Sequence, residues 1–408
     1  MRSTLPLVFS ALVAVGFAAC GDGGADTATA ASSASSASSA LSSSSAAGGT
    51  AGHGGALTTH SAGGSGGTGG QGGEHASSSV ATGAGGAGGG CQNLLPAVTE
   101  PPAKLSETGL YADITTKKVA AYARAYAPQF SLWADDAKKQ RHVYLPECGT
   151  IDTTDMDGWQ FPVGTRAWKE FSLGGKRLET RMMVRYGSAT KDILYATYQW
   201  DEEQTDATLV VGGAKNVLGT DHDIPDELGC RRCHGPYPAK GGLPSRFLGL
   251  DALQLSHDGP GLTLASLIAE GLLSSPPAGN FVVPGTAIER EALGYLHANC
   301  GSCHNDTSEG LLFPSFNARV KTTDADVVST GAYKTMVNQP TQLFVGFGCN
   351  YRLAGGSTAN SCSYVRMTER GTDMAPNLKQ MPPTGTEVID VTGTAALGAW
   401  IAILPPPP

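Results

Sequence analysis

The sequence predicts an α+β multidomain chain in which an antiparallel β domain is followed by an all-α domain. Three observations lead to this prediction. Residues 110–230 contain short runs of alternating polar and apolar residues, bounded by turn residues. Residues 286–408 contain two runs with helical periodicity. Residues 21–90 are too poor in apolar side chains to form a core, so both domains lie after them.

The overall charge excludes one class of function. The chain has 408 residues and a formal net charge of −8. A mildly acidic chain offers no basic surface for nucleic acid, so we expect no nucleic-acid partner.

Residues 1–20 have the features of a signal peptide. Arg2 precedes an apolar run, Leu5–Ala19, that is too short to span a bilayer as a mature helix. Ala18 and Ala19 before Cys20 resemble the lipobox of bacterial lipoproteins, which implies lipidation at Cys20. The alternative is an ordinary secretory signal that is cleaved nearby. We expect export in either case, and a lipid anchor in the membrane, in the periplasm or at the cell surface, in the first.

Residues 21–90 are predicted to be a disordered linker. They consist almost wholly of Gly, Ser, Ala and Thr. Such a segment cannot bury enough apolar surface to offset the entropy lost on ordering.

The β domain is expected over residues 91–260. One run alternates clearly, with Leu178, Thr180 and Met182 on one side and Glu179 and Arg181 on the other. The predicted strands are Arg141–Leu145, Thr165–Leu173, Lys176–Tyr186, Ile193–Trp200 and Ala207–Val211.

Two cysteine motifs carry the strongest functional signal. Residues 230–234 and 300–304 both read C-x-x-C-H, the attachment pattern of a c-type haem. The two thiols add to the porphyrin vinyl groups, and the adjacent histidine binds the iron. The alternatives are a redox dithiol or a zinc site, and the zinc site requires the two cysteine pairs to meet in space. The sequence therefore predicts two covalent haem c groups, attached through Cys230, Cys233, Cys300 and Cys303, with His234 and His304 as iron ligands.

Four further cysteines remain besides Cys20. An even number in an oxidising compartment suggests disulfides. Cys349 and Cys362 flank a loop rich in Gly, Ser and Asn, so they are plausible partners, which leaves Cys91 with Cys148. Sequence alone does not fix this pairing.

The first motif has no long helix before it. Pro225 lies five residues before Cys230, so at most one helical turn fits between them. The sixth ligand of the first haem is left open by the sequence. The candidates are His222, His142, His257, Met182 and Met183.

The second motif follows a predicted helix. Thr286 and Glu289 form a capping-box pattern that opens a helix over Ala287–Asn299. A final helix is expected over Thr394–Leu404, ended by Pro405. Residues 261–285 are expected to form a connecting helix and linker.

Residues 286–408 resemble a class I cytochrome c domain. Ala292 and Leu296 match the first helix of that family, and Leu397 and Trp400 match the helix that crosses it. The resemblance implies Met381, which precedes two prolines, as the sixth ligand of the second haem. Met374 and Met367 are its rivals. A thioether ligand raises the reduction potential and leaves no open position for substrate, which favours electron transfer.

About 90 residues of the β domain resemble the β-sheet c-type cytochromes, which include the β form of cytochrome c-prime. The likeness rests on Phe161–Thr165, on Lys169 and on the closing C-x-x-C-H-G at 230–235. It implies a distal side that is vacant or crosslinked, with Lys169 facing the haem, whereas an ordinary strand lysine would extend into water.

Residues 125–401 also resemble an uncharacterised bacterial dihaem c-type cytochrome family. The shared phrases include Tyr144–Pro146, Glu179–Arg181 and Gln204–Ala207. We expect an electron carrier that serves an unidentified redox partner protein. The alternative is a haem oxidoreductase, or a small-ligand-binding protein, with an open site at the first haem.

Overall fold

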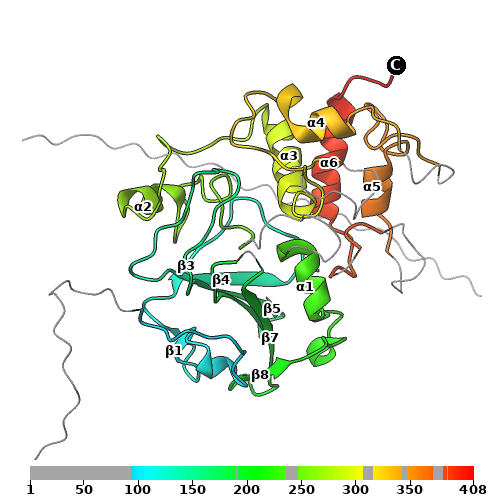
Figure 1. The fold of residues 1–408 in the computed structure, drawn as a ribbon. Helices are drawn as coiled ribbons and strands as arrows, with labels where there is room; N and C mark the ends of the chain where they lie inside the picture. The colour runs from blue at the N-terminus through cyan, green and yellow to red at the C-terminus, as the bar shows by residue number, and fades with distance from the viewer. Residues whose placement is uncertain are drawn as a thin grey trace, which may run out of the picture. The chain divides into compact units, whose positions relative to one another are not determined.

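Six antiparallel strands form the main sheet of the computed structural model, and each strand pairs with the next along the chain (Figure 1). A helical region follows, which confirms the α+β class expected from the sequence. The structure describes residues 93–189, 191–235, 247–306, 316–341, 348–370, 380–383 and 385–408. The expected signal peptide and linker, with Cys20 and Cys91, lie outside these residues. The strands of the sheet are β3 (Arg124–Ala125), β4 (Lys138–Tyr144), β5 (Arg166–Leu173), β6 (Lys176–Arg185), β7 (Ile193–Trp200) and β8 (Ala207–Val210).

Short elements surround the sheet, and longer helices follow it. Before the sheet lie η1 (Leu105–Glu107) and the strand pair β1 (Tyr111–Asp113) and β2 (Lys118–Val119). The elements after it are η2 (Val217–Gly219), α1 (Glu227–His234), α2 (Leu264–Ala269), α3 (Ala287–Asn299), η3 (Val327–Ser329), α4 (Gly331–Met336), α5 (Cys362–Met367) and α6 (Val391–Ile403).

The strand bounds follow the sequence pattern closely, with one clear difference. β7 has the predicted bounds, and β5, β6 and β8 differ from prediction by one residue at an end. β4 begins at Lys138, before the predicted start at Arg141. Residues 138–140 are all polar, so alternation could not reveal them. Their pairing is set by β5, where Lys138 lies opposite Ser172.

The sheet buries a different core on each face, because successive side chains of a strand point to opposite sides. One face, called here the opposite face, carries Trp168, Met182 and Trp200, which pack against the segment before the sheet. The other, called the motif face, carries Val143 and Met183. Four leucines of the expected connecting segment complete the core of the motif face: Leu262, Leu264, Leu267 and Leu273. The boundaries proposed at residues 260 and 285 stay predictions.

Helices α3 and α6 pack against each other through apolar side chains. α3 has its predicted bounds, and the predicted capping box is present between Thr286 and Glu289. α6 begins at Val391, before the predicted Thr394, because the carboxylate of Asp390 caps it by accepting a hydrogen bond from the Gly393 amide at 2.8 Å. The residues expected at the crossing, Ala292, Leu296, Leu397 and Trp400, all lie in this core.

The segment between β3 and β4 joins the sheet to the helical region. The Trp133 amide donates to the Asn299 side chain at the end of α3, at 2.7 Å. The Asp135 carboxylate accepts from the amides of Glu387 and Val388 at 3.0 Å. These contacts explain why the described residues all fall in one compact unit. Among them, no helix is both long and apolar enough to cross a membrane.

Candidate functional site

The first cysteine motif occupies the last five residues of α1. The carboxylate of Asp226 caps this helix by accepting from the Gly229 amide at 2.7 Å. Glu227 and Arg231 form an ion pair one turn apart, at 2.6 Å. The helix therefore starts within one turn of Cys230, as Pro225 requires, and it continues through the motif.

A tyrosine of the sheet lies over the first motif. The Tyr195 ring on β7 has its centroid 6.2 Å from that of His234. The Arg231 guanidinium lies 5.6 Å from the same tyrosine ring. Tyr195 packs against the core of the motif face, so α1 lies on that side of the sheet (Figure 1).

Three basic residues form one row across the motif face, called here the basic row. Arg141 on β4 lies opposite Lys169 on β5, and Lys169 lies opposite Arg181 on β6. The charges of Lys169 and Arg181 both act on the Cys233 thiol, which places the row beside the first motif. Like charges directly opposite one another destabilise a sheet, so the row requires negative charge nearby.

One buried carboxylate neutralises part of the basic row. Glu179 on β6 is 0% exposed. It accepts from Arg181 Nε at 2.9 Å, and its other oxygen lies 2.7 Å from His222 Nε2. Burial opposes its ionisation, but Arg181 and His222 outweigh burial and lower the pKa of Glu179. This carboxylate is bonded to Arg181, and its charge also acts on Lys169.

Lys169 is half-buried on the motif face. Its Nζ lies 4.8 Å from the centre of the Phe171 ring. Burial lowers the pKa of Lys169 well below its ordinary value, and the charges of Arg141 and Arg181 lower it further. That Lys169 faces a haem stays a prediction.

Most candidates for the sixth ligand of the first haem are engaged elsewhere. His222 is bonded to Glu179, and the Nε2 of His257 lies 2.6 Å from the Ala127 carbonyl oxygen. Two more candidates lie on the opposite face. His142 is paired with Trp168, and Met182 is buried in the core of that face.

Met183 is the candidate that lies on the motif face. Its side chain is packed in the apolar core there and is 8% exposed. Of the five expected candidates, Met183 is therefore the one on the motif face that packs in the apolar core there.

The second motif forms a tight turn at the end of α3. Cys300 caps the helix, and its amide donates to the Leu296 carbonyl at 2.9 Å. The amide of His304 donates to the Cys300 carbonyl at 2.8 Å. The turn thereby brings the motif's first cysteine and its histidine close together.

His304 lies in an apolar environment that keeps its ring neutral. The ring is stacked on Phe316, with centroids 4.0 Å apart, and the residue is 9% exposed. Burial lowers the pKa of His304 to about 4, and the charges of Arg366 and Arg352 contribute. Its Nδ1 is buried without a hydrogen-bond partner. A neutral imidazole is the form that binds metals.

The methionine candidates for the second haem differ in position. The Met381 amide donates to the Arg366 carbonyl at 2.8 Å, and the Arg366 charge acts on His304. Arg366 therefore links Met381, through a backbone hydrogen bond, to His304 of the second motif, through its charge. Met367 is buried in the core between α3 and α6, where coordination would disrupt packing. Met374 lies outside the described residues.

The two motifs meet through one cysteine each. Cys303 of the second motif lies close enough to Cys233 of the first that, with burial, it raises the pKa of the Cys233 thiol well above its ordinary value. Burial raises the pKa of Cys300 to about 12. None of the four motif cysteines forms a disulfide.

The structure joins Cys349 and Cys362 in a disulfide, as expected from their spacing. The other expected pair, Cys91 with Cys148, stays a prediction because Cys91 lies outside the described residues.

The chemistry of these residues fits haem c better than zinc. Each motif offers two reduced thiols for thioether bonds and a histidine for iron. A zinc site needs about four ligands around one point. Among the residues that the structure describes, no group of three or more His, Cys, Asp or Glu side chains is arranged to hold a metal ion.

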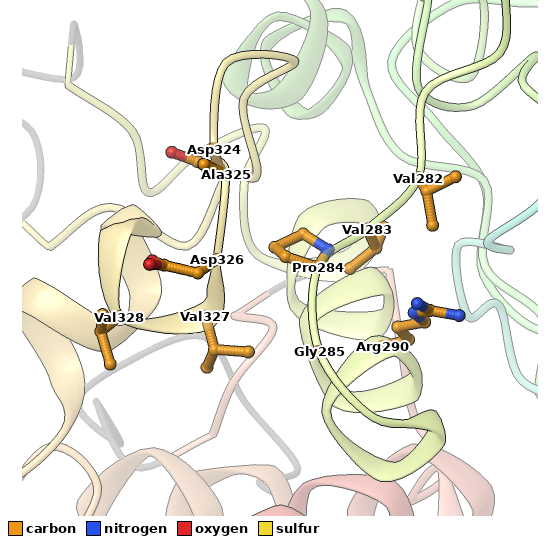
Figure 2. A pocket seen from close by; sticks show the side chains of 10 residues that line it. All are labelled: Val282, Val283, Pro284, Gly285, Arg290, Asp324, Ala325, Asp326, Val327 and Val328. Atoms are coloured by element: carbon orange, nitrogen blue, oxygen red, sulfur yellow. The ribbon is translucent and has the colours of Figure 1, made fainter.

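One surface hollow lies apart from both motifs. It has a volume of about 530 Å³ and lies between the segment before α3 and the segment at η3 (Figure 2). Val282, Val283 and Pro284 line one side, and Asp324 and Asp326 belong to the other. Its described lining includes no histidine or cysteine, so it adds nothing to the metal chemistry.

The sequence interpretation missed several residues that surround the motifs. Tyr195 and Phe316 lie against the motif histidines His234 and His304, and Arg141 lies opposite Lys169. The one signal in the sequence was the charged side of the β6 alternation, which includes Arg181. Comparison with protein-family models, curated proteins and solved structures finds no match to this chain.

Proposed function

We propose that this chain is an exported c-type cytochrome that carries two covalent haem c groups and transfers electrons. The observation that carries the proposal is the pair of C-x-x-C-H motifs, which lie close enough for Cys303 of one to act on the Cys233 thiol of the other. Haem groups attached at neighbouring cysteine sulphurs would lie close to each other. Electrons can then pass between them within one chain before leaving for a partner protein.

The residues of the chain supply attachment, ligation and exclusion of water. Haem c, when bound, supplies reversible one-electron chemistry. Cys230, Cys233, Cys300 and Cys303 form the thioethers, and His234 and His304 are the proximal ligands. The neutral, buried ring of His304 needs no deprotonation before it binds iron.

The second site is proposed to be a high-potential, six-coordinate centre in a class I cytochrome c-like domain. Met381 is its proposed sixth ligand, supported by the backbone bond to Arg366 and by the burial of its rival Met367. The first site is proposed to be the haem site at the end of a β domain. Lipidation at Cys20 would anchor the chain to a membrane in the periplasm or at the cell surface, and residues 21–90 would act as a tether.

A redox titration compared with two single-haem variants tests the proposal. One variant carries Cys230→Ala and Cys233→Ala, and the other carries Cys300→Ala and Cys303→Ala. The proposal predicts that the unaltered protein takes up two electrons reversibly. It also predicts that its titration differs from the sum of the variants, because reduction of one site lowers the potential of its neighbour. A curve equal to that sum would contradict close placement and direct exchange.

A second function, at an open iron position, is favoured by the engagement and position of the candidate ligands around the first motif. His222 and His257 are engaged, and His142 lies on the opposite face of the sheet. An iron at His234 would then keep an open position, as in an oxidoreductase or a small-ligand-binding protein. Ferric spectra decide between the two: a high-spin fraction equal to half the haem supports the open site, whereas two low-spin centres support a carrier alone.

A further inference from the structure

An aromatic ring covers one face of the imidazole of His304, the proposed iron ligand of the second motif. The centre of the Phe316 ring lies 4.0 Å from the centre of the imidazole, and the two ring planes are inclined by 9°. The imidazole cannot turn out of its plane without displacing the phenyl ring, because close-packed rings leave no space between them. The stack therefore restricts the orientation of the imidazole.

A hydrogen bond does not supply this orientation within the described part of the chain. Metal-binding histidines usually donate the N–H of the second ring nitrogen to a carboxylate, a backbone carbonyl or water, and that bond fixes the ring. The Nδ1 of His304 is buried and has no such partner among the described residues. The stack on Phe316 is therefore the contact that holds the plane of the imidazole.

Phe316 is itself supported by the disulfide loop, residues 349–362, which the bond between Cys349 and Cys362 closes. Arg352 in this loop lies 6.0 Å from the centre of the Phe316 ring, a distance at which a guanidinium is attracted to an aromatic ring. Arg352 is fixed in turn, because its Nη1 donates to the Thr335 carbonyl in α4 at 2.6 Å. The loop thereby helps to hold the stacked phenyl ring in place.

We infer that Phe316 is a positioning residue that fixes the plane of the His304 imidazole on the iron of the second haem. The inference rests on the proposed function and goes beyond it by assigning a role to a side chain outside both motifs. In low-spin ferric haem, the plane of the axial imidazole decides which iron d orbital holds the unpaired electron. The spin density at the haem methyl groups follows that orbital, so the methyl resonances report the orientation of the imidazole.

The test is the ferric proton NMR spectrum of the full chain with both haems. The resonances of the second haem are those that a variant with Cys300→Ala and Cys303→Ala lacks. A fixed imidazole plane predicts a wide spread of the methyl shifts in the unaltered protein. Phe316→Leu keeps an apolar side chain but removes the flat ring, so the imidazole can turn and the spread should narrow. Phe316→Tyr keeps the flat ring and should restore the spread.

Phe281→Leu is the matched control, because Phe281 is another partly buried phenylalanine packed against the core between α3 and α6. The methyl shifts of this variant should equal those of the unaltered protein. The inference is wrong if Phe316→Leu leaves the spread unchanged, or if Phe281→Leu narrows it equally. A high-spin second haem in Phe316→Leu would also count against it, because the ring would then support the sixth ligand and not the plane of the imidazole.

The unaltered protein offers a second measurement if Phe316→Leu does not fold. In the reduced, diamagnetic protein, nuclear Overhauser effects should connect the ring protons of Phe316 with those of His304, and their absence would overturn the inference. Haem content is measured in every sample. Failure of the unaltered chain to bind haem at the second motif refutes the proposed function, whereas full haem content with an unchanged spread in Phe316→Leu refutes only the role of Phe316.

Discussion

Asp251→Asn should destabilise the protein in a strongly pH-dependent way. Asp251 Oδ2 lies 3.7 Å from His297 Nε2 on α3, and the other carboxylate oxygen accepts from the Gln254 amide at 2.9 Å. Burial opposes ionisation, but His297 and Arg319 outweigh burial and lower the pKa of Asp251 to about 2. This contact joins the core of the motif face to the helix that ends at the second motif.

The size of the effect follows from that pKa. A fall from 3.8 in the unfolded chain to about 2 in the folded protein corresponds to about 2 kcal/mol of stability at neutral pH. Because the folded pKa is depressed, this stability is complete above the unfolded value and is lost as pH falls towards about 2. The difference between Asp251→Asn and the unaltered protein should therefore be about 2 kcal/mol at pH 6, and about half as large at pH 3.

Denaturant unfolding at pH 6 and pH 3 measures this difference. Asp258→Asn, at an exposed position close in sequence, controls for the loss of one negative charge. A difference of equal size at both pH values would refute the electrostatic explanation and would indicate lost packing or the lost bond to Gln254.

Three further changes test other parts of the structure. Gly393→Ala places a Cβ 2.1 Å from the Tyr295 ring and should cost about 1–3 kcal/mol in denaturant unfolding, whereas Gly398→Ala on the same helix, at 3.3 Å from its nearest neighbour, should cost much less. Met381→Ala should remove the red absorption band of iron–thioether ligation but leave the covalent haem in place, and Met367→Ala should keep the band; the opposite pattern would refute Met381 as ligand. Cys20→Ala should release the protein from the membrane fraction with an unchanged spectrum, and continued membrane association would refute the lipid anchor.

Local signals allowed most elements to be predicted from the sequence. The bounds of α3 follow from its capping box and its apolar periodicity, both of which lie within a few residues. α6 was predicted to start too late because Val391 and Gly393 are poor helix formers, and the cap at Asp390 outweighs them. Strand alternation identified the central strands but missed the polar start of β4.

The candidate site depended on contacts that a local pattern cannot show. The two motifs could be identified from five residues each, but the contact between Cys233 and Cys303 depends on how α1 and α3 are positioned by the rest of the fold. The basic row arises from the register of three strands, so Arg141 comes to lie opposite Lys169 only when the sheet forms. Similarly, the strand pairing that puts His142 on the opposite face is a long-range property of the sheet.

Covalent haem content per chain tests the central claim most directly. The protein is produced with a c-type maturation system, extracted with acidic acetone, and measured by intact mass and haem absorbance. The proposal predicts two haems that resist extraction, and one in each variant that lacks the cysteines of a single motif. Haem that is extracted from the unaltered protein, or a chain whose mass shows no attached haem, would contradict it.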